Sequence, residues 1–238
     1  MSKVFDFSAF WQGYLACAPF ILVVAPFGLL FGVVATEAGF NLAETMTMTV
    51  LVIAGAAQFT AIALLQEQAP TIVIILASLA VNLRMAMYSL ALVPHIGKAP
   101  LATRMFAAYF LVDQVYAVSA NRFEHGQPLS LLQKTSYLFG TAAAVAPFWY
   151  GFTLLGALIG EAIPAHWSVD FALPVCFISM FAPLMRSLPH LAAALVSITV
   201  SLMLYWMPYN LWLLVASLLA MMAAVQVERW QARQRMAT

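Results

Sequence analysis

The stretch from Thr71 to Pro94 is the part of this sequence that most constrains the fold. It is apolar and longer than the roughly 20 residues that a helix needs to cross a bilayer, yet it carries Asn82 and Arg84 near its middle. An arginine at the centre of a lipid-facing helix costs roughly 2.5 kcal/mol or more. We therefore expect Arg84 to face protein, a counter-ion or water.

The composition extends this membrane character to the whole chain. Of the 238 residues, 64% are hydrophobic and only 8% are charged, whereas a soluble domain is about 25% charged. The sequence therefore predicts an all-α fold, a polytopic transmembrane helical bundle that forms a single transport domain over residues 1–238. The net charge of +1 gives no basic field for a nucleic-acid partner. No histidine pair stands at metal-ligand spacing, so we expect neither a metal nor a cofactor.

Eight apolar stretches are candidate spans, although seven crossings remain possible because the sixth and seventh are short and interrupted by proline. The predicted spans are 15–36, 46–65, 71–94, 102–121, 135–159, 169–187, 190–207 and 209–227. With a cytoplasmic N-terminus, Arg122, Lys134 and the C-terminal arginines lie inside, and Lys98 and Arg104 lie outside. This predicts a protein of the cytoplasmic (inner) membrane with both termini in the cytoplasm.

An internal repeat is a further prediction. Val24–Phe27 and Val145–Phe148 both read Val-Ala-Pro-Phe, and each opens a glycine-rich half-span that ends at Glu37 or Glu161. Transporter folds are often built from such repeats, with the site between them. The repeat halves would be 13–121 and 134–227, parallel with four spans each or inverted with three and a linker. Chance similarity between apolar segments is the alternative.

The second predicted span contains a run of small residues, Ala54–Ala57, followed directly by Gln58. In a membrane such a run indicates either close contact between helices or a helix that breaks beside a cavity. Gln58 favours a site, because a buried amide needs partners. Gly55 and Gln58 are therefore candidate substrate-binding residues.

The third and fourth predicted spans carry opposite charges at similar depth. Arg84 and Tyr88 share one helical face, whereas Asn82 lies about 200° away from Arg84. Asp113 is either the partner of Arg84 or a proton carrier, since burial favours the neutral carboxyl group. We expect Asn82, Arg84 and Tyr88 to bind substrate and Asp113 to couple protons. A purely structural ion pair fits the sequence almost as well.

Taken together, these segments resemble the AzlC family, the large subunits of branched-chain amino acid exporters. The matching segments are Phe27–Gly32 with Gly39 downstream, Ala54–Phe59, Asn82–Arg84 with Tyr88 and Ser89, Asp113, and Asp170–Pro174. The resemblance implies export of a small hydrophobic amino acid and a small AzlD-like membrane subunit as partner. Family members often place a histidine after the arginine and a glutamate after the aspartate. This chain has Met85 and Gln114, which leaves Asp113 as the main proton carrier.

An apolar pocket for a branched side chain is expected from Phe59, Ile62, Met85 and Met87. Two other classes of protein remain as alternatives. A passive channel is one, but no filter-like motif is present. An intramembrane enzyme is the other, and it would need a nucleophile with a base, or paired acids, at membrane depth. Asp113 is the clear mid-span acid, which argues against an aspartyl pair.

Overall fold

The computed structural model describes residues 5–160, 185, 187–207 and 211–237, and the regular structure in these ranges is helical. The chain forms two compact units. The first contains Met1–Ile62 and Ser78–Val169, and the second contains Ala63–Ala77 and Asp170–Thr238. The prediction of an all-α membrane fold is confirmed.

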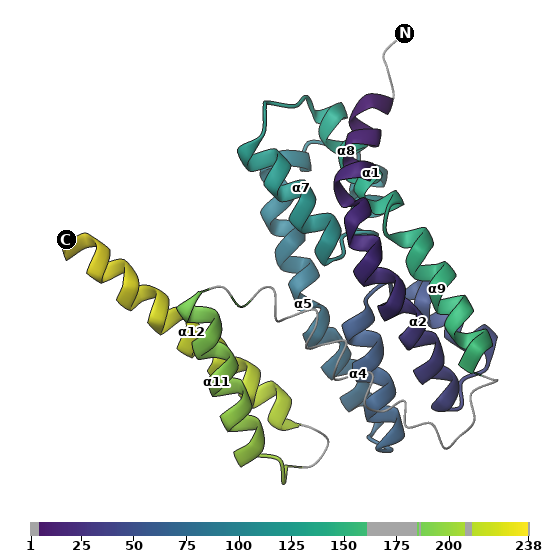
Figure 1. Ribbon diagram of the computed structural model, residues 1–238, viewed down its shortest axis with the longest axis vertical. Helices are drawn as coiled ribbons and strands as arrows, with labels where there is room; N and C mark the ends of the chain where they lie inside the picture. The colour runs from purple at the N-terminus through teal and green to yellow at the C-terminus, as the bar shows by residue number, and fades with distance from the viewer. Residues whose placement is uncertain (1–4, 161–184, 186, 208–210, 238) are drawn as a thin grey trace. The chain divides into compact units, whose positions relative to one another are not determined.

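The helices follow one another in this order along the chain (Figure 1). Their bounds are α1 Phe7–Cys17, η1 Ala18–Phe20, α2 Ile21–Glu37, α3 Leu42–Leu51, α4 Gly55–Gln66, α5 Thr71–Ile96, α6 Leu101–Tyr109, α7 Asp113–His125, α8 Leu131–Ala143, α9 Ala146–Gly160, α11 Leu188–Met203 and α12 Leu211–Ala237. In the second unit, α11 and α12 pack against each other.

Three helical segments among the described residues are long and apolar enough to cross a membrane. They are Phe7–Glu37, Thr71–Ile96 and Leu131–Gly160. The first begins earlier than predicted because the Asp6 side chain caps α1 by accepting a hydrogen bond from the backbone of Ala9. The third also begins earlier, because Ser130 and Gln133 form a capping box. The predicted span 169–187 lies almost wholly outside the described residues.

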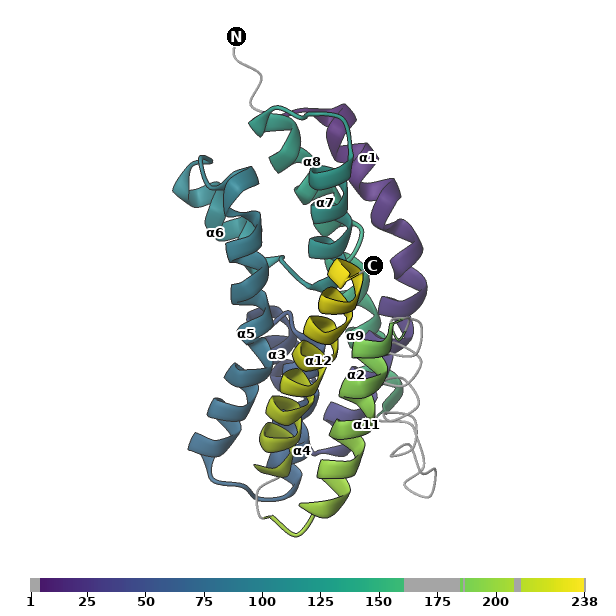
Figure 2. The same cartoon turned by 90° about the vertical axis from the view of Figure 1, so that its left-hand side faces the viewer.

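The predicted spans 46–65 and 102–121 are not continuous helices, so these two predictions are wrong. Val52–Ala54 separate α3 from α4, and residues 110–112 separate α6 from α7. Gln58 Nε2 donates to Thr49 Oγ1 at 3.2 Å, although nine residues of straight helix would span about 13.5 Å. The chain therefore bends sharply between α3 and α4. Figure 2 shows α6 running from the end of α5 to the middle of the unit and α7 returning towards α8.

The two long helical segments at residues 7–37 and 131–160 lie side by side through small residues. A Cβ added at Gly32 would collide with the backbone of Thr153, and one added at Gly156 would collide with the backbone of Leu29. Such close contact is typical of membrane helices, where small residues let backbones approach. The two glycine-rich segments of the predicted repeat thus pack on each other. The repeat halves 13–121 and 134–227 stay a prediction.

The basic residues of the first unit gather at its N-terminal end. Lys134 Nζ lies 3.2 Å from His95 Nδ1, and the Asp6 backbone N–H donates to Ser136 Oγ at 3.0 Å. The expectation that Lys98 and Arg104 lie opposite Lys134 is therefore wrong. The reason is that α6 and α7 enter and return to the same end instead of crossing (Figure 2).

Candidate functional site

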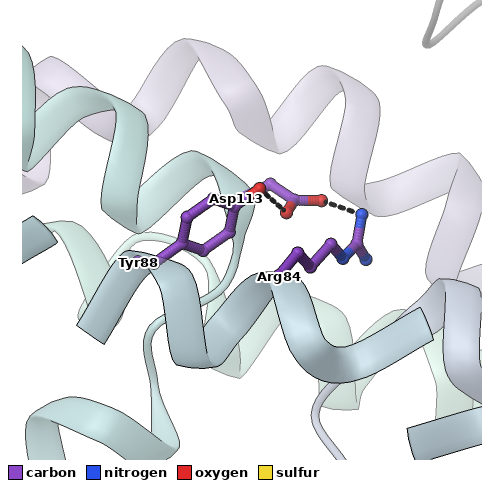
Figure 3. A network of polar contacts seen from close by, with 3 residues as sticks. All are labelled: Arg84, Tyr88 and Asp113. Carbon is purple, nitrogen blue, oxygen red and sulfur yellow. Dashed lines mark hydrogen bonds and ion pairs between the residues drawn. The ribbon is translucent and has the colours of Figure 1, made fainter. Parts of the chain in front are cut away.

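An ion pair joins the middle of α5 to the first residue of α7 (Figure 3). Arg84 Nη1 lies 2.9 Å from Asp113 Oδ2. One turn further along α5, Tyr88 Oη donates to Asp113 Oδ1, also at 2.9 Å. Both carboxylate oxygens are therefore engaged by α5. The expected approach of Arg84 and Asp113 is confirmed.

The break before α7 places Asp113 where an anion is favoured. Val112 has an extended backbone, and Asp113 is the first helical residue after it. The first N–H groups of a helix lack helical partners and carry a partial positive charge. The helix end and Arg84 thus both stabilise the carboxylate. The side chains are 28% and 32% exposed for Arg84 and Asp113, so the pair is not sealed inside the protein.

Tyr116 flanks the ion pair from α7. Its ring stacks on Tyr88 with centroids 4.2 Å apart and an interplanar angle of 8°. The stack orients the Tyr88 hydroxyl towards Asp113. Asn82 does not join this group: its Oδ1 is buried and has no hydrogen-bond partner. The structure therefore gathers Arg84, Tyr88 and Asp113, and it leaves Asn82 outside their contacts.

Gln58 belongs to a second, fully buried polar cluster. Its Nε2 donates to Thr49 Oγ1, and Trp149 Nε1 donates to the same oxygen at 3.0 Å. Gln58 Oε1 has no partner, nor have the hydroxyls of Thr45 and Thr153. Sequence reasoning missed Thr49 and Trp149, because 100 residues separate them and neither carries a charge.

Gly55 realises both alternatives that the sequence left open. It begins α4 directly after the break at Val52–Ala54. A Cβ at Gly55 would lie 2.7 Å from the Phe27 ring and 2.9 Å from the Trp149 ring. The predicted close contact is confirmed, and the helix breaks immediately before this glycine.

Tyr109 connects the two helix breaks. It is the last residue of α6, and its hydroxyl donates to the carbonyl oxygen of Val50, in the last turn of α3. The same hydroxyl lies 2.8 Å from Tyr150 Oη on α9. Carbonyls in the last turn of a helix lack helical partners, so Tyr109 supplies one. The break that positions Asp113 is thereby attached to the break beside Gly55.

The four residues expected to form an apolar pocket are not alike in environment. Phe59 and Ile62 are buried in the core, where the Phe59 ring packs against Phe27 and Phe31. Met87 is 67% exposed. Among the described residues no group of three or more histidine, cysteine or acidic side chains is placed to hold a metal ion. Glu37 ends α2, and Glu161 lies outside the described residues.

The fold and the site define a helical membrane protein with an ion pair at a helix break. The sequence profile of the family described as AzlC protein matches residues 19–163. This chain belongs to the AzlC family.

The relatives it matches are themselves membrane proteins. An "Uncharacterized membrane protein" of Archaeoglobus fulgidus is 31% identical over 192 residues, covering 81% of this chain and 80% of the relative. One of Helicobacter pylori is 27% identical, covering 65% and 66%. "Inner membrane protein YgaZ" of Escherichia coli is 24% identical, covering 72% and 71%. No solved structure matches the chain.

Proposed function

We propose that this protein exports small hydrophobic amino acids, the branched-chain ones foremost, across the cytoplasmic (inner) membrane in exchange for protons. It would act as the large subunit of an exporter with a small AzlD-like membrane subunit. The single observation that carries this proposal is the Arg84–Asp113 ion pair at the end of a broken helix. Membership of the AzlC family supports it.

A zwitterionic substrate suits the chemistry of this site. An amino acid carries one carboxylate and one ammonium group, and the site offers one fixed charge of each sign. Transporters commonly bind such substrates where helices break near the middle of the membrane, because free backbone groups and helix dipoles are available there. The breaks at Val52–Ala54 and at residues 110–112, which Tyr109 connects, supply these features.

Proton coupling follows from two states of Asp113. While Asp113 is paired with Arg84 and Tyr88, its charged form is favoured. When the pair separates in a less hydrated site, the neutral acid is favoured instead. A transport cycle that alternates between these states takes up and releases one proton, and that differential protonation couples the gradient to the substrate.

The placement of basic residues supports a cytoplasmic N-terminus. Lys98, Arg104, Arg122 and Lys134 all lie towards the N-terminal end of the first unit, whereas Glu37 and Glu44 lie at the far end of the Phe7–Glu37 helix. Lysine and arginine accumulate on the cytoplasmic side of membrane proteins. A cytoplasmic C-terminus remains part of the proposal.

The test is efflux of labelled leucine from cells that express the protein alone or with an AzlD-like subunit. The proposal expects leucine efflux that requires both proteins and that an uncoupler abolishes. Efflux from the chain alone would remove the partner from the proposal. Efflux that never exceeds passive equilibration would identify a channel instead.

A further inference from the structure

The Arg84 guanidinium uses only part of its binding capacity in this structure. A guanidinium carries five N–H donors, and Arg84 contacts Asp113 through Nη1. Its Nε is buried and has no hydrogen-bond partner. Figure 3 shows Nε and the second terminal nitrogen on the side that faces away from Asp113. One complete edge of the guanidinium is thus left without an acceptor.

That edge has the geometry of a carboxylate receptor. The N–H groups of Nε and Nη2 run nearly parallel, and they match the two oxygens of a carboxylate in a bidentate pair. Buried donors in native proteins almost always have a partner. The buried Nε therefore indicates an acceptor that is absent from the chain itself.

The neighbouring side chains do not supply this acceptor. Both oxygens of Asp113 are already engaged, and the Tyr88 hydroxyl donates its proton to Asp113. Glu37 and Glu44 lie at the far end of the first unit, and the described part of the chain places no other acid at Arg84. The acceptor must come from a bound molecule.

The charge balance selects the kind of anion. Asp113 already neutralises one unit of charge beside Arg84. A doubly charged phosphate would be repelled by the Asp113 carboxylate, whereas a singly charged carboxylate is repelled less. A monocarboxylate fits both the shape of the edge and its charge.

We propose that the Nε–Nη2 edge of Arg84 binds the carboxylate of the transported substrate while Nη1 remains paired with Asp113. This inference rests on the proposed function and names the part of the substrate that Arg84 recognises. Arg84 is then both the substrate anchor and the direct link between substrate binding and the protonation of Asp113.

The test is calorimetric binding to the purified protein in lipid nanodiscs. The probes are leucine, leucinamide, which lacks the carboxylate, and 4-methylpentanoate, which lacks the amine. The wild-type protein should bind leucine roughly 10- to 100-fold more tightly than leucinamide, as expected for a charge-assisted pair. Arg84→Lys keeps a cation for Asp113 but removes the planar edge, so this ratio should fall to about one.

The control is Arg104→Lys, the same substitution at an exposed residue of α6, which should keep the wild-type ratio. A wild-type protein that binds leucine and leucinamide equally overturns the inference whether or not Arg84→Lys folds. An unchanged ratio in folded Arg84→Lys also overturns it, as does competition by inorganic phosphate. Arg84-dependent binding of 4-methylpentanoate without binding of leucine upholds the carboxylate site and refutes amino-acid export.

Discussion

Asp113 holds the site together at the scale of single residues. One oxygen pairs with Arg84, the other accepts from Tyr88, and the first turn of α7 lies behind the carboxylate. Each contact favours the charged acid, so protonation weakens all three at once. A single proton can therefore separate α5 from α7 at this point.

Replacing Asp113 with asparagine tests this role. The amide resembles the protonated acid in shape and carries no charge, so the variant should lose gradient-driven leucine efflux but keep downhill leucine exchange. Both are measured with labelled leucine in proteoliposomes. Loss of exchange as well would assign Asp113 to structure or to substrate binding. Full gradient-driven efflux would move the proton carrier elsewhere, with Glu37 and Glu161 as the next candidates.

At the scale of elements, the two helix breaks determine where the polar groups meet. Neither Val52–Ala54 nor residues 110–112 contain glycine or proline, so the sequence carries no ordinary signal of interruption. The breaks depend on contacts made by distant segments, such as the hydrogen bond from Tyr109 to Val50. Hydropathy predicted α5 almost to the residue because α5 is a continuous apolar helix. It failed for 46–65 and 102–121 because apolar halves read the same whether or not they are joined.

Gly55 offers a direct test of the first break. Leucine at this position would collide with the rings of Phe27 and Trp149. Gly55→Leu should abolish transport while membrane insertion continues, which quantitative blotting of membrane fractions and an efflux assay can show. Gly151→Leu is the matched control, because nothing lies within 4 Å of a Cβ there. Normal efflux in Gly55→Leu would show that the close contact is dispensable.

Tyr109 tests the connection between the breaks. Tyr109→Phe removes the hydrogen bond to Val50, which should cost about 1 kcal/mol of stability and slow transport several-fold with little change in leucine affinity. Tyr150→Phe removes only the tyrosine pair and should have a smaller effect. Efflux kinetics and binding measurements separate the two variants. If Tyr150→Phe slows transport as much as Tyr109→Phe, the Val50 bond is not the connection that matters.

The whole molecule shows which features can be predicted from sequence. The membrane character, the long helices and the Arg84–Asp113 pair follow from apolar length and from opposite charges at similar depth. The buried cluster of Gln58, Thr49 and Trp149 could not be predicted, because uncharged polar residues in distant segments leave no pattern of their own. The position of Lys98 was predicted wrongly because it depended on counting every apolar stretch as a crossing.

The corrected arrangement makes its own prediction about sidedness. Lys98→Cys and Lys134→Cys should react with a membrane-impermeant thiol reagent from the same side, the cytoplasmic one, since both residues lie at the N-terminal end of the first unit. Glu44→Cys should react from the opposite side. Each is made in a background with Cys17 and Cys176 replaced by alanine. Labelling of Lys98→Cys and Lys134→Cys from different sides would refute the re-entrant path of α6 and α7.

The central claim is that proton movement drives an amino acid through a site built on Arg84 and Asp113. The most direct measurement is leucine accumulation in proteoliposomes under an imposed proton gradient, with the purified protein and its small partner. The account predicts accumulation of labelled leucine above the external concentration, collapse of that accumulation with an uncoupler, and no accumulation in Asp113→Asn. Leucine that only equilibrates across the membrane, with or without the gradient, would contradict the account.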